Sequence, residues 1–393
     1  MKRIYLDHIA ATPLAPSVLE AMLPCFREHF GNPQSLHAEG QAAATAVAVS
    51  REAVARLIGA SAGEIIFTSS GTEANNFAIK GLALAHRAKG SHIVLSAVEH
   101  LSVLNAAKSL EKSGFTTTLV PVDREALVDP VEVEKAIRKE TVLVSVMLAN
   151  SEVGTVEPVA EIAKAAKARG VLVHTDAVAA AGNMPVDVRT LGVDALSLAG
   201  DQFYGPKGGA ALFVRKGVRI LPLIDGGIQE GGRRGGTENV PAIVGLGKAA
   251  ELALAAMAER QARMARLRDR LIDGLLGSVD HVLLSGSRER RLPHQASYFV
   301  RFVEGEALLL SLDLKGFAAS SGSACTSKAL KASHVHLAMG LDHATAQGSL
   351  VFSLLDTTTA EDIDALVAVF PPVVDRLRKM SPLYTEFLKE KTP

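Results

Sequence analysis

Three short stretches carry side chains that could bind an anion, orient a ligand and supply a nucleophile. FTSSGTEANNFAIKG, residues 67–81, passes from a strand-like run through Ser-Ser-Gly-Thr into a helical pattern. Backbone N–H groups at such a helix start suit a phosphate, although the same residues also fit an ordinary helix cap. HTDA, residues 174–177, places Asp176 at the carboxyl end of an apolar strand, where open α/β sheets bind ligands. SSGSACTS holds Cys325 in a loop of small residues, which favours an exposed, reactive thiol.

The elements that would position these side chains alternate along the chain. Alanine-rich amphipathic segments and short β-branched runs succeed one another over the first two thirds of the sequence, and one helical pattern, PVAEIAKAAKARG, is ended by Gly170. Repeated alternation of strand and helix predicts a mostly parallel sheet covered on both faces. The predicted strands are residues 92–98, 116–122, 141–149, 171–177, 195–200 and 209–216.

A long helical pattern over residues 240–276 leads from this sheet into a shorter tail of mixed elements. The tail contains the strand-like runs HVLLSG and ASYFVRFVE, a helical run GEALLLSLDLKG and a final helical stretch over residues 360–379. We therefore expect an α/β fold of two domains. The large domain takes residues 14–255, and a smaller α+β domain takes residues 1–13 and 256–393 and carries the Cys325 loop.

The composition excludes several classes of partner. Lysine and arginine together number 42, as do aspartate and glutamate, so the formal net charge is zero. Without a positive field we expect neither a nucleic acid nor a membrane surface as a partner. Asp7 and His8 stand where a signal peptide would continue apolar, and no uninterrupted apolar run reaches the roughly 18 residues of a spanning helix, so we expect a cytoplasmic protein. The other of the two cysteines, Cys25, is expected to serve packing.

Taken together, these stretches resemble the cysteine desulfurases of the NifS/IscS type, within the fold-type I pyridoxal-phosphate (PLP) enzymes of aminotransferase class V. The resemblance spans nearly the whole chain. It implies a seven-stranded, mostly parallel sheet in the large domain and a homodimer whose active sites lie at the subunit interface. The ordered matches are YLDHIAATP, GNPQSLH, SSGTEANN, the EH pair at Glu99, ANSEVGT, HTDA, YGPKG, GTENVPAIVGLGKA, EGEALLL, SSGSACTS and SHVHLAMGL.

The resemblance also implies roles for individual residues. In that family a lysine holds PLP as a Schiff base, and a loop cysteine attacks the sulfur of the substrate cysteine, leaving alanine and an enzyme persulfide. By motif match, Cys325 is this nucleophile, Asp176 pairs with the pyridinium nitrogen and His100 stacks on the cofactor ring. The resemblance also implies that Thr72 binds the phosphate from the same chain and that Thr237 of the partner subunit binds it from the other chain. Asn32 is implied to contact the substrate carboxylate.

The chain departs from the family where the lysine should stand, because the residue there is Gln202, whose amide cannot form an imine. Lys207 does not replace it, since it matches a lysine that the family already carries within GPKG. Asp201 stands where the family has a phosphate-binding histidine, and two negative charges about 4 Å apart repel by about 4 kcal/mol at an effective dielectric near 20. We therefore expect no covalent PLP. The chain also lacks the family's cofactor- or substrate-binding residue at five further positions, and at Val351 the family has the arginine that binds the substrate carboxylate. The five positions are Ser151, Ala179, Ala199, Val351 and Asp356.

These departures favour a PLP-independent desulfurase homologue in sulfur or iron-sulfur metabolism. In this interpretation Cys325 accepts, relays or ligates sulfur or an iron-sulfur cluster at the interface with an acceptor or scaffold protein. Two alternatives involve no metal. The first is an active cysteine desulfurase that holds PLP noncovalently or through another lysine. The second is a noncatalytic subunit paired with an active paralogue. Whether the chain is an enzyme is therefore open at this point.

A third alternative is metal-dependent activity in a vacated PLP pocket. Thiolate and imidazole ligands suit zinc or iron. The side chains that such a site would use are Cys325, His8, His100, Asp176 and Asp201.

Overall fold

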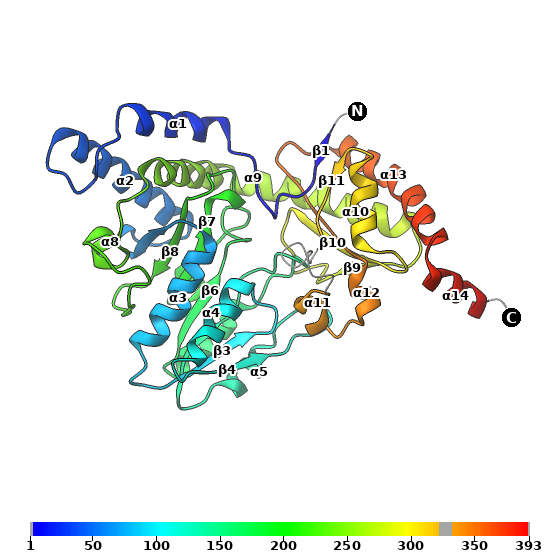
Figure 1. Ribbon diagram of the computed structural model, residues 1–393, viewed down its shortest axis with the longest axis horizontal. Helices are drawn as coiled ribbons and strands as arrows, with labels where there is room; N and C mark the ends of the chain where they lie inside the picture. Colours follow the sequence, from blue (N-terminus) through cyan, green and yellow to red (C-terminus); the bar gives the residue numbers. More distant parts are fainter. Residues whose placement is uncertain (1–2, 322–331, 392–393) are drawn as a thin grey trace.

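The computed structural model describes residues 3–321 and 332–391. The chain forms a larger body around a seven-stranded sheet and a smaller body around a three-stranded sheet, and the long helix α9 (Val240–Ser278) runs through both (Figure 1). This arrangement confirms the predicted α/β fold class with a mostly parallel central sheet.

The large sheet has the strand order β2-β8-β7-β6-β5-β3-β4. Strand β8 runs antiparallel to its neighbours β2 and β7, and the other adjacent pairs are parallel. The parallel arrangement brings the carboxyl ends of strands from distant parts of the sequence to one edge. The strands are β2 (Ile65–Thr68), β3 (His92–Ser96), β4 (Thr116–Val120), β5 (Thr141–Ser145), β6 (Leu172–Asp176), β7 (Ala195–Ala199) and β8 (Ala210–Val214).

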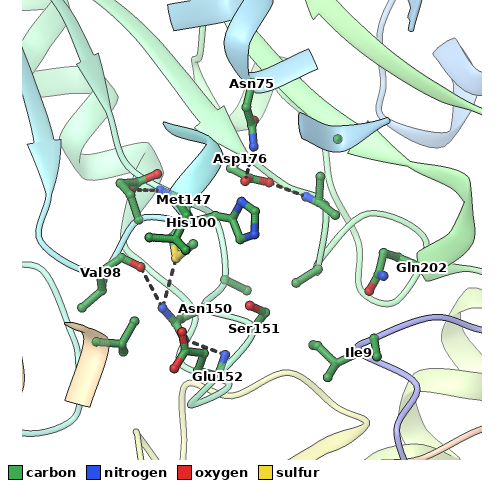
Figure 2. Close-up of a pocket in the computed structure, with 18 of the residues that line it drawn as sticks. Ile9, Asn75, Val98, His100, Met147, Asn150, Ser151, Glu152, Asp176 and Gln202 are labelled. Atoms are coloured by element: carbon green, nitrogen blue, oxygen red, sulfur yellow. Dashed lines mark hydrogen bonds between the residues drawn. The ribbon is translucent and has the colours of Figure 1, made fainter. Parts of the chain in front are cut away.

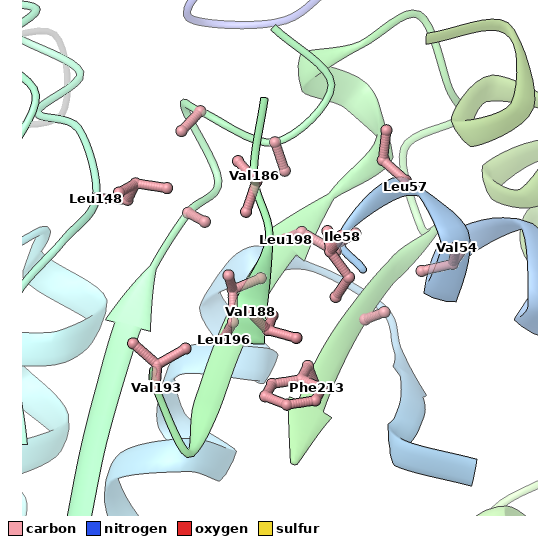
Figure 3. Packing of buried hydrophobic residues seen from close by; sticks show 14 of the residues in the cluster. Val54, Leu57, Ile58, Leu148, Val186, Val188, Val193, Leu196, Leu198 and Phe213 are labelled. Carbon is pink, nitrogen blue, oxygen red and sulfur yellow. The ribbon is translucent and has the colours of Figure 1, made fainter. Parts of the chain in front are cut away.

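Helices cover both faces of this sheet, which is why its central strands are apolar at consecutive positions. Because side chains alternate across a strand, Phe213 of β8 packs on one face with Leu198 and Val54 (Figure 3), while Leu212 packs on the other face with Phe77. The elements of this body besides α9 are α1 (Pro16–Arg27), α2 (Ala38–Leu57), η1 (Ala62–Glu64), α3 (Gly71–Ala85), α4 (Leu101–Glu111), α5 (Pro130–Ala136), α6 (Val159–Ala168), α7 (Val188–Leu191), η2 (Gly200–Gln202) and α8 (Gln229–Gly232).

The smaller body is built on the antiparallel sheet β12-β10-β9. The N-terminal strand β1 (Ile4–Tyr5) joins this part of the molecule by pairing with β11 (Phe317–Ala318). The other elements are β9 (Val282–Ser285), β10 (Gln295–Val300), α10 (Gly305–Asp313), α11 (His334–Ala338), α12 (His343–Gln347), β12 (Ser349–Ser353), α13 (Ala360–Lys379) and α14 (Pro382–Lys391).

Helix α9 is, in the described part of the chain, the one helix long and apolar enough to cross a membrane by length and composition. Half of its most apolar window is buried inside the protein, as in the core helix of a soluble protein. Its first part contributes Met257 to the core of the large body, and its second part contributes Met264 and Leu271 to the core of the small body. The apolar character of α9 is therefore used in packing.

Candidate functional site

A cavity of about 480 Å³ lies at the carboxyl ends of the parallel strands. Segments that follow β2, β3, β5, β6 and β7 form its walls, and Ser320, Ser333 and Val351 close it from the side of the small body. Figure 2 shows His100, Asp176 and Gln202 facing this space. The predicted ligand-binding edge of the sheet is therefore where the cavity lies.

Asp176, the last residue of β6, is almost fully buried and is held from two sides. Its Oδ2 accepts a 2.6 Å hydrogen bond from Asn75 Nδ2, and its Oδ1 accepts a 2.9 Å bond from the Val178 backbone N–H. Burial raises the pKa of Asp176, while these hydrogen bonds and the nearby His100 oppose the rise. The carboxyl group is thus fixed in orientation at the base of the cavity.

His100 is connected to Asp176 through two intervening side chains. Asn75 Nδ2 also donates to Ser102 Oγ at 2.9 Å, and Ser102 Oγ lies 2.7 Å from His100 Nδ1. The Ser102 backbone N–H donates to the same Nδ1 at 3.1 Å, because His100 is the N-cap of α4. With Nδ1 acting as acceptor, a neutral imidazole carries its proton on Nε2.

The N-terminus of α3 forms another wall of the cavity. Ser70 is the N-cap and accepts from the Glu73 N–H at 3.1 Å, and Gly71 and Thr72 follow at the start of the helix. A side chain at Gly71 would lie 2.6 Å from the Val178 side chain, so only glycine fits there. The helix start is therefore exposed and opens into the cavity, and the anion site there stays a prediction.

Gln202 and Asp201 belong to the short helix η2 and are fixed mainly through their backbones. The Gln202 carbonyl accepts from Asn183 Nδ2 at 2.9 Å and lies 2.8 Å from His8 Nε2. The Asp201 carbonyl accepts from the Thr12 N–H and hydroxyl, both at 2.9 Å. Burial raises the pKa of the Asp201 side chain, and the charge of Lys207 opposes this rise.

The structure places other predicted site residues away from this cavity. Both nitrogens of His8 face backbone carbonyls, those of Leu354 at 3.0 Å and Gln202 at 2.8 Å, and the ring packs on His294. Asn32 and Thr237 are exposed on the surface and do not line the cavity of their own chain.

The predicted metal ligands are only partly brought together. His100, Asp176 and Asp201 line the cavity, whereas Cys325 lies outside the described residues. Over residues 3–321 and 332–391, no group of three or more His, Cys, Asp or Glu side chains is arranged to hold a metal ion.

Two glutamates line the cavity although the sequence patterns gave them no role. Glu99 is fully buried, and its Oε1 accepts 2.7 Å bonds from Ser96 Oγ and the Met147 N–H. Burial raises the pKa of Glu99 to about 8 and that of Glu152 to about 7. Their only sequence signal was their presence in the EH and ANSEVGT stretches.

Comparison with known proteins agrees with this geometry. The family model for aminotransferase class-V matches residues 4–366. The chain is 48% identical over 382 residues to cysteine desulfurase IscS of Methanosarcina thermophila, covering 97% of this chain and 94% of that protein. It is also 48% identical to cysteine desulfurase IscS of Dictyoglomus turgidum, covering 98% of each.

A solved NifS-like protein superimposes with a TM-score of 0.89 at 37% identity, covering 95% of this chain and 100% of that one. SspA in complex with cysteine superimposes with a TM-score of 0.80 at 35% identity, covering 89% and 98%.

These matches contradict the expectation of a PLP-independent homologue, because relatives 46–48% identical over nearly the whole chain are named cysteine desulfurases. The matches also contradict the expectation of no covalent PLP, because PLP is the cofactor of the desulfurases that the chain resembles. The physical error lay in treating Asp201 as an isolated charge. Burial raises its pKa and Lys207 lies near it, while the helix start at Gly71 is retained.

Proposed function

We propose, since the chain belongs to the aminotransferase class-V family, that it is a cysteine desulfurase that binds PLP in the cavity at the carboxyl ends of the parallel strands. The observation that carries this proposal is the hydrogen-bonded series Asp176, Asn75, Ser102 and His100. The series presents to one cavity the carboxyl group and the imidazole that the resemblance assigns to the pyridinium nitrogen and to the ring of the cofactor.

The residues present fit the cofactor. The cavity volume of about 480 Å³ falls in the range of roughly 300–1,000 Å³ typical of small-molecule sites. Asp176 would hold the pyridinium nitrogen, His100 would face the ring, and the α3 N-terminus at Gly71 and Thr72 would hold the phosphate. Gln202 carries an amide where the resemblance places the Schiff-base lysine, and it lines the same cavity.

When bound, PLP supplies an electron sink for the bond changes at the substrate's amino-bearing carbon. The chain's own residues prepare the site for it. Asn75 orients the Asp176 carboxyl group, and Ser102 fixes the tautomer of His100 by donating to Nδ1. The sulfur-accepting nucleophile would be Cys325, by its motif match.

The same proposal extends to the assembly. The exposed positions of Asn32 and Thr237 fit sites completed by a second copy of the chain, so we infer a homodimer. A desulfurase needs a recipient for sulfur, and we infer a cytoplasmic acceptor or iron-sulfur scaffold protein.

The test is to add PLP to the purified protein and record absorbance and alanine release from cysteine. We expect a cofactor band near the visible edge and cysteine-dependent alanine. The Gln202→Lys variant should hold PLP in a borohydride-reducible linkage at residue 202, and Asp176→Ala should lose both band and product. Failure of the parent protein to bind millimolar PLP, or to release alanine when PLP is bound, would refute the proposal.

A further inference from the structure

The turn at residues 150–155, called here the cavity turn, forms one wall of the cavity. The residues of this turn that line the cavity are Asn150, Ser151 and Glu152. In Figure 2 these residues lie on the opposite side of His100 from Asp176. The turn belongs to the large body, since it follows β5, but it lies where the small body meets the cavity.

Two buried side chains of the small-body strand β10 donate hydrogen bonds to this turn. Gln295 Nε2 donates to the Ser151 carbonyl and Ser297 Oγ donates to the Glu152 carbonyl, each at 2.7 Å. Gln295 Nε2 also donates to Ser297 Oγ at 3.1 Å, which leaves the Ser297 hydroxyl proton for the Glu152 carbonyl. Both side chains are on the same face of β10, and both residues are at most 1% exposed.

The orientation of the Gln295 amide serves the turn at a cost. The Ser151 carbonyl can only accept, so the amide nitrogen must face it. Gln295 Oε1 is then buried without a partner in the described structure, which is unfavourable. Gly154 allows this close approach, because a Cβ there would lie 3.2 Å from Gln295 Oε1 and 3.0 Å from Arg291 Nη1.

Strand β10 also holds the opposite wall of the cavity. Ser297 pairs with Val351 of β12 across the small sheet. Val351 in turn exchanges backbone hydrogen bonds of 2.7 and 3.1 Å with Ser320, and both of these residues line the cavity. One strand therefore connects the cavity turn to the wall on the side of the small body.

The side chains assigned to PLP are held in a different way. Asp176 accepts from Asn75 and from the Val178 backbone, and His100 contacts Ser102, all within the large body. With PLP against Asp176 and His100, the substrate takes the space that remains beside the cavity turn and the small body. A displaced turn should therefore disturb the substrate more than the cofactor.

We propose that Gln295 and Ser297 are positioning residues of the reaction. They hold the cavity turn at a fixed distance from Val351 and so shape the part of the cavity that receives the substrate. This inference rests on the desulfurase function proposed above. It assigns neither residue a contact with the substrate.

Two variants remove the donors separately. Ser297→Ala removes the bond to the Glu152 carbonyl, and Gln295→Glu keeps the shape of the side chain but loses the N–H group that faces Ser151. The new carboxylate can be balanced by Arg291 Nη1, which also lies against Gly154 and has no partner in the described structure. Backbone bonds of Arg290 and Leu292 to the chain at Val156 and Gly154 remain in both variants.

The first measurement is hydrogen–deuterium exchange of the full-length protein without PLP. The backbone N–H groups of residues 152–154 are bonded to Asn150 within the turn. We expect them to exchange at least about fivefold faster in both variants, while the amides of the central strand β6 keep the exchange rate of the parent protein.

The second measurement compares two affinities in the same variants. PLP is titrated by absorbance, and L-alanine, the thiol-free product, is then titrated calorimetrically into the PLP-loaded protein. We expect PLP affinity to stay within about twofold of the parent value and alanine to bind at least about fivefold more weakly. The KM for cysteine should rise by a similar factor.

Tyr298→Phe is the matched control. Tyr298 is the next residue of β10, its side chain packs in the core of the small body, and its buried hydroxyl has no partner in the described structure. This variant should leave exchange and both affinities unchanged. Equal weakening of PLP and alanine in the two test variants would indicate general damage and overturn the inference, as would behaviour like that of Tyr298→Phe.

The outcomes separate this inference from the proposed function. A parent protein that releases alanine from cysteine, with test variants that match the control, contradicts only the positioning role. A parent protein that binds no PLP contradicts the desulfurase function. In that case faster exchange of residues 152–154 still supports the positioning of the turn, and unchanged exchange overturns it.

Discussion

Glu99 and Glu157 are glutamates enclosed in the large body with only one of their two carboxyl oxygens bonded. Glu157 Oε2 accepts from the Val128 N–H at 2.9 Å, and its Oε1 has no partner in the described structure. Burial raises the pKa of each to about 8. The two carboxyl groups therefore bind their protons more tightly in the folded protein than in the unfolded chain. Protonation of these groups stabilises the fold at low pH, and this contribution to the free energy of unfolding is lost as pH rises from about 4.5 through 8.

We expect Glu157→Gln to stabilise the protein relative to the parent as pH increases. The amide cannot ionise and its oxygen can still accept from Val128, so the variant should gain about 2–4 kcal/mol relative to the parent between pH 5 and pH 9, since one pKa unit corresponds to about 1.4 kcal/mol. Urea unfolding at both pH values measures this gain. Glu161→Gln, at an exposed position of α6, is the control and should show no such trend. A Glu157→Gln effect of the same size at both pH values would show that the carboxyl group does not titrate as expected.

At the scale of single residues the sequence could indicate Asp176, because it ends an apolar strand-like run. It could indicate His100 only through the motif shared with the family. It could not indicate that Asn75 connects them, since Asn75 lies 101 residues before Asp176 and the contact exists only after folding. The error over PLP has a related cause. The exchange at Gln202 is visible in the sequence, but the surroundings that moderate the charge of Asp201 are not.

The loop that contains α8 is attached to the large sheet by one buried ion pair. Arg51 of α2 binds both carboxyl oxygens of Glu230 at 2.7 Å, and the same carboxylate accepts from the Phe67 N–H at 3.0 Å. Glu230 has a positive φ of 50°, which is strained for a residue with a side chain. Arg234 in the same loop binds Glu73 in the first turn of α3 at 3.0 Å. The loop that leads to Thr237 is therefore fixed relative to the start of α3.

We expect Glu230→Ala to destabilise the protein by about 3–5 kcal/mol, because it leaves Arg51 buried without its counter-ion. The free energy of unfolding in urea measures the loss. Asp273→Ala breaks the exposed pair with Arg288 and serves as the matched control, for which little change is expected. Comparable losses in the two variants would show that the Glu230 pair is not a structural anchor.

The main elements were largely predictable because their patterns are strong. All six predicted strands correspond to strands of the large sheet. The alternation with helices predicted a mostly parallel sheet, and among these six strands β8 alone runs antiparallel to its neighbours. The helical pattern over residues 240–276 corresponds to α9. The loop around α8 could not be predicted, since its conformation depends on the contact between Glu230 and Arg51, which are 179 residues apart.

The molecule as a whole exposes an apolar surface on and around α1 and α2. Leu19, Phe26, Phe30 and Val49 are between 46% and 71% exposed, which is unusual for large apolar side chains gathered in one region. Asn32 lies between the same two helices. The second copy of the chain that we infer above would cover this surface.

We expect the double variant Phe26→Glu, Phe30→Glu to be monomeric by light scattering and to bind PLP at least about tenfold more weakly than the parent protein. The physical reason is that buried charges oppose association, and each cavity then lacks the partner's Thr237. Val131→Glu, at an exposed apolar position on α5, is the control and should leave both properties unchanged.

A sharper measurement uses mixed dimers of Thr237→Val and Asp176→Ala chains. If sites are shared, one of the two cavities in each mixed dimer combines an intact Asp176 with an intact Thr237 from the other subunit. The mixed dimer should then recover about half of the parent activity, whereas sites confined to one chain would gain nothing from mixing.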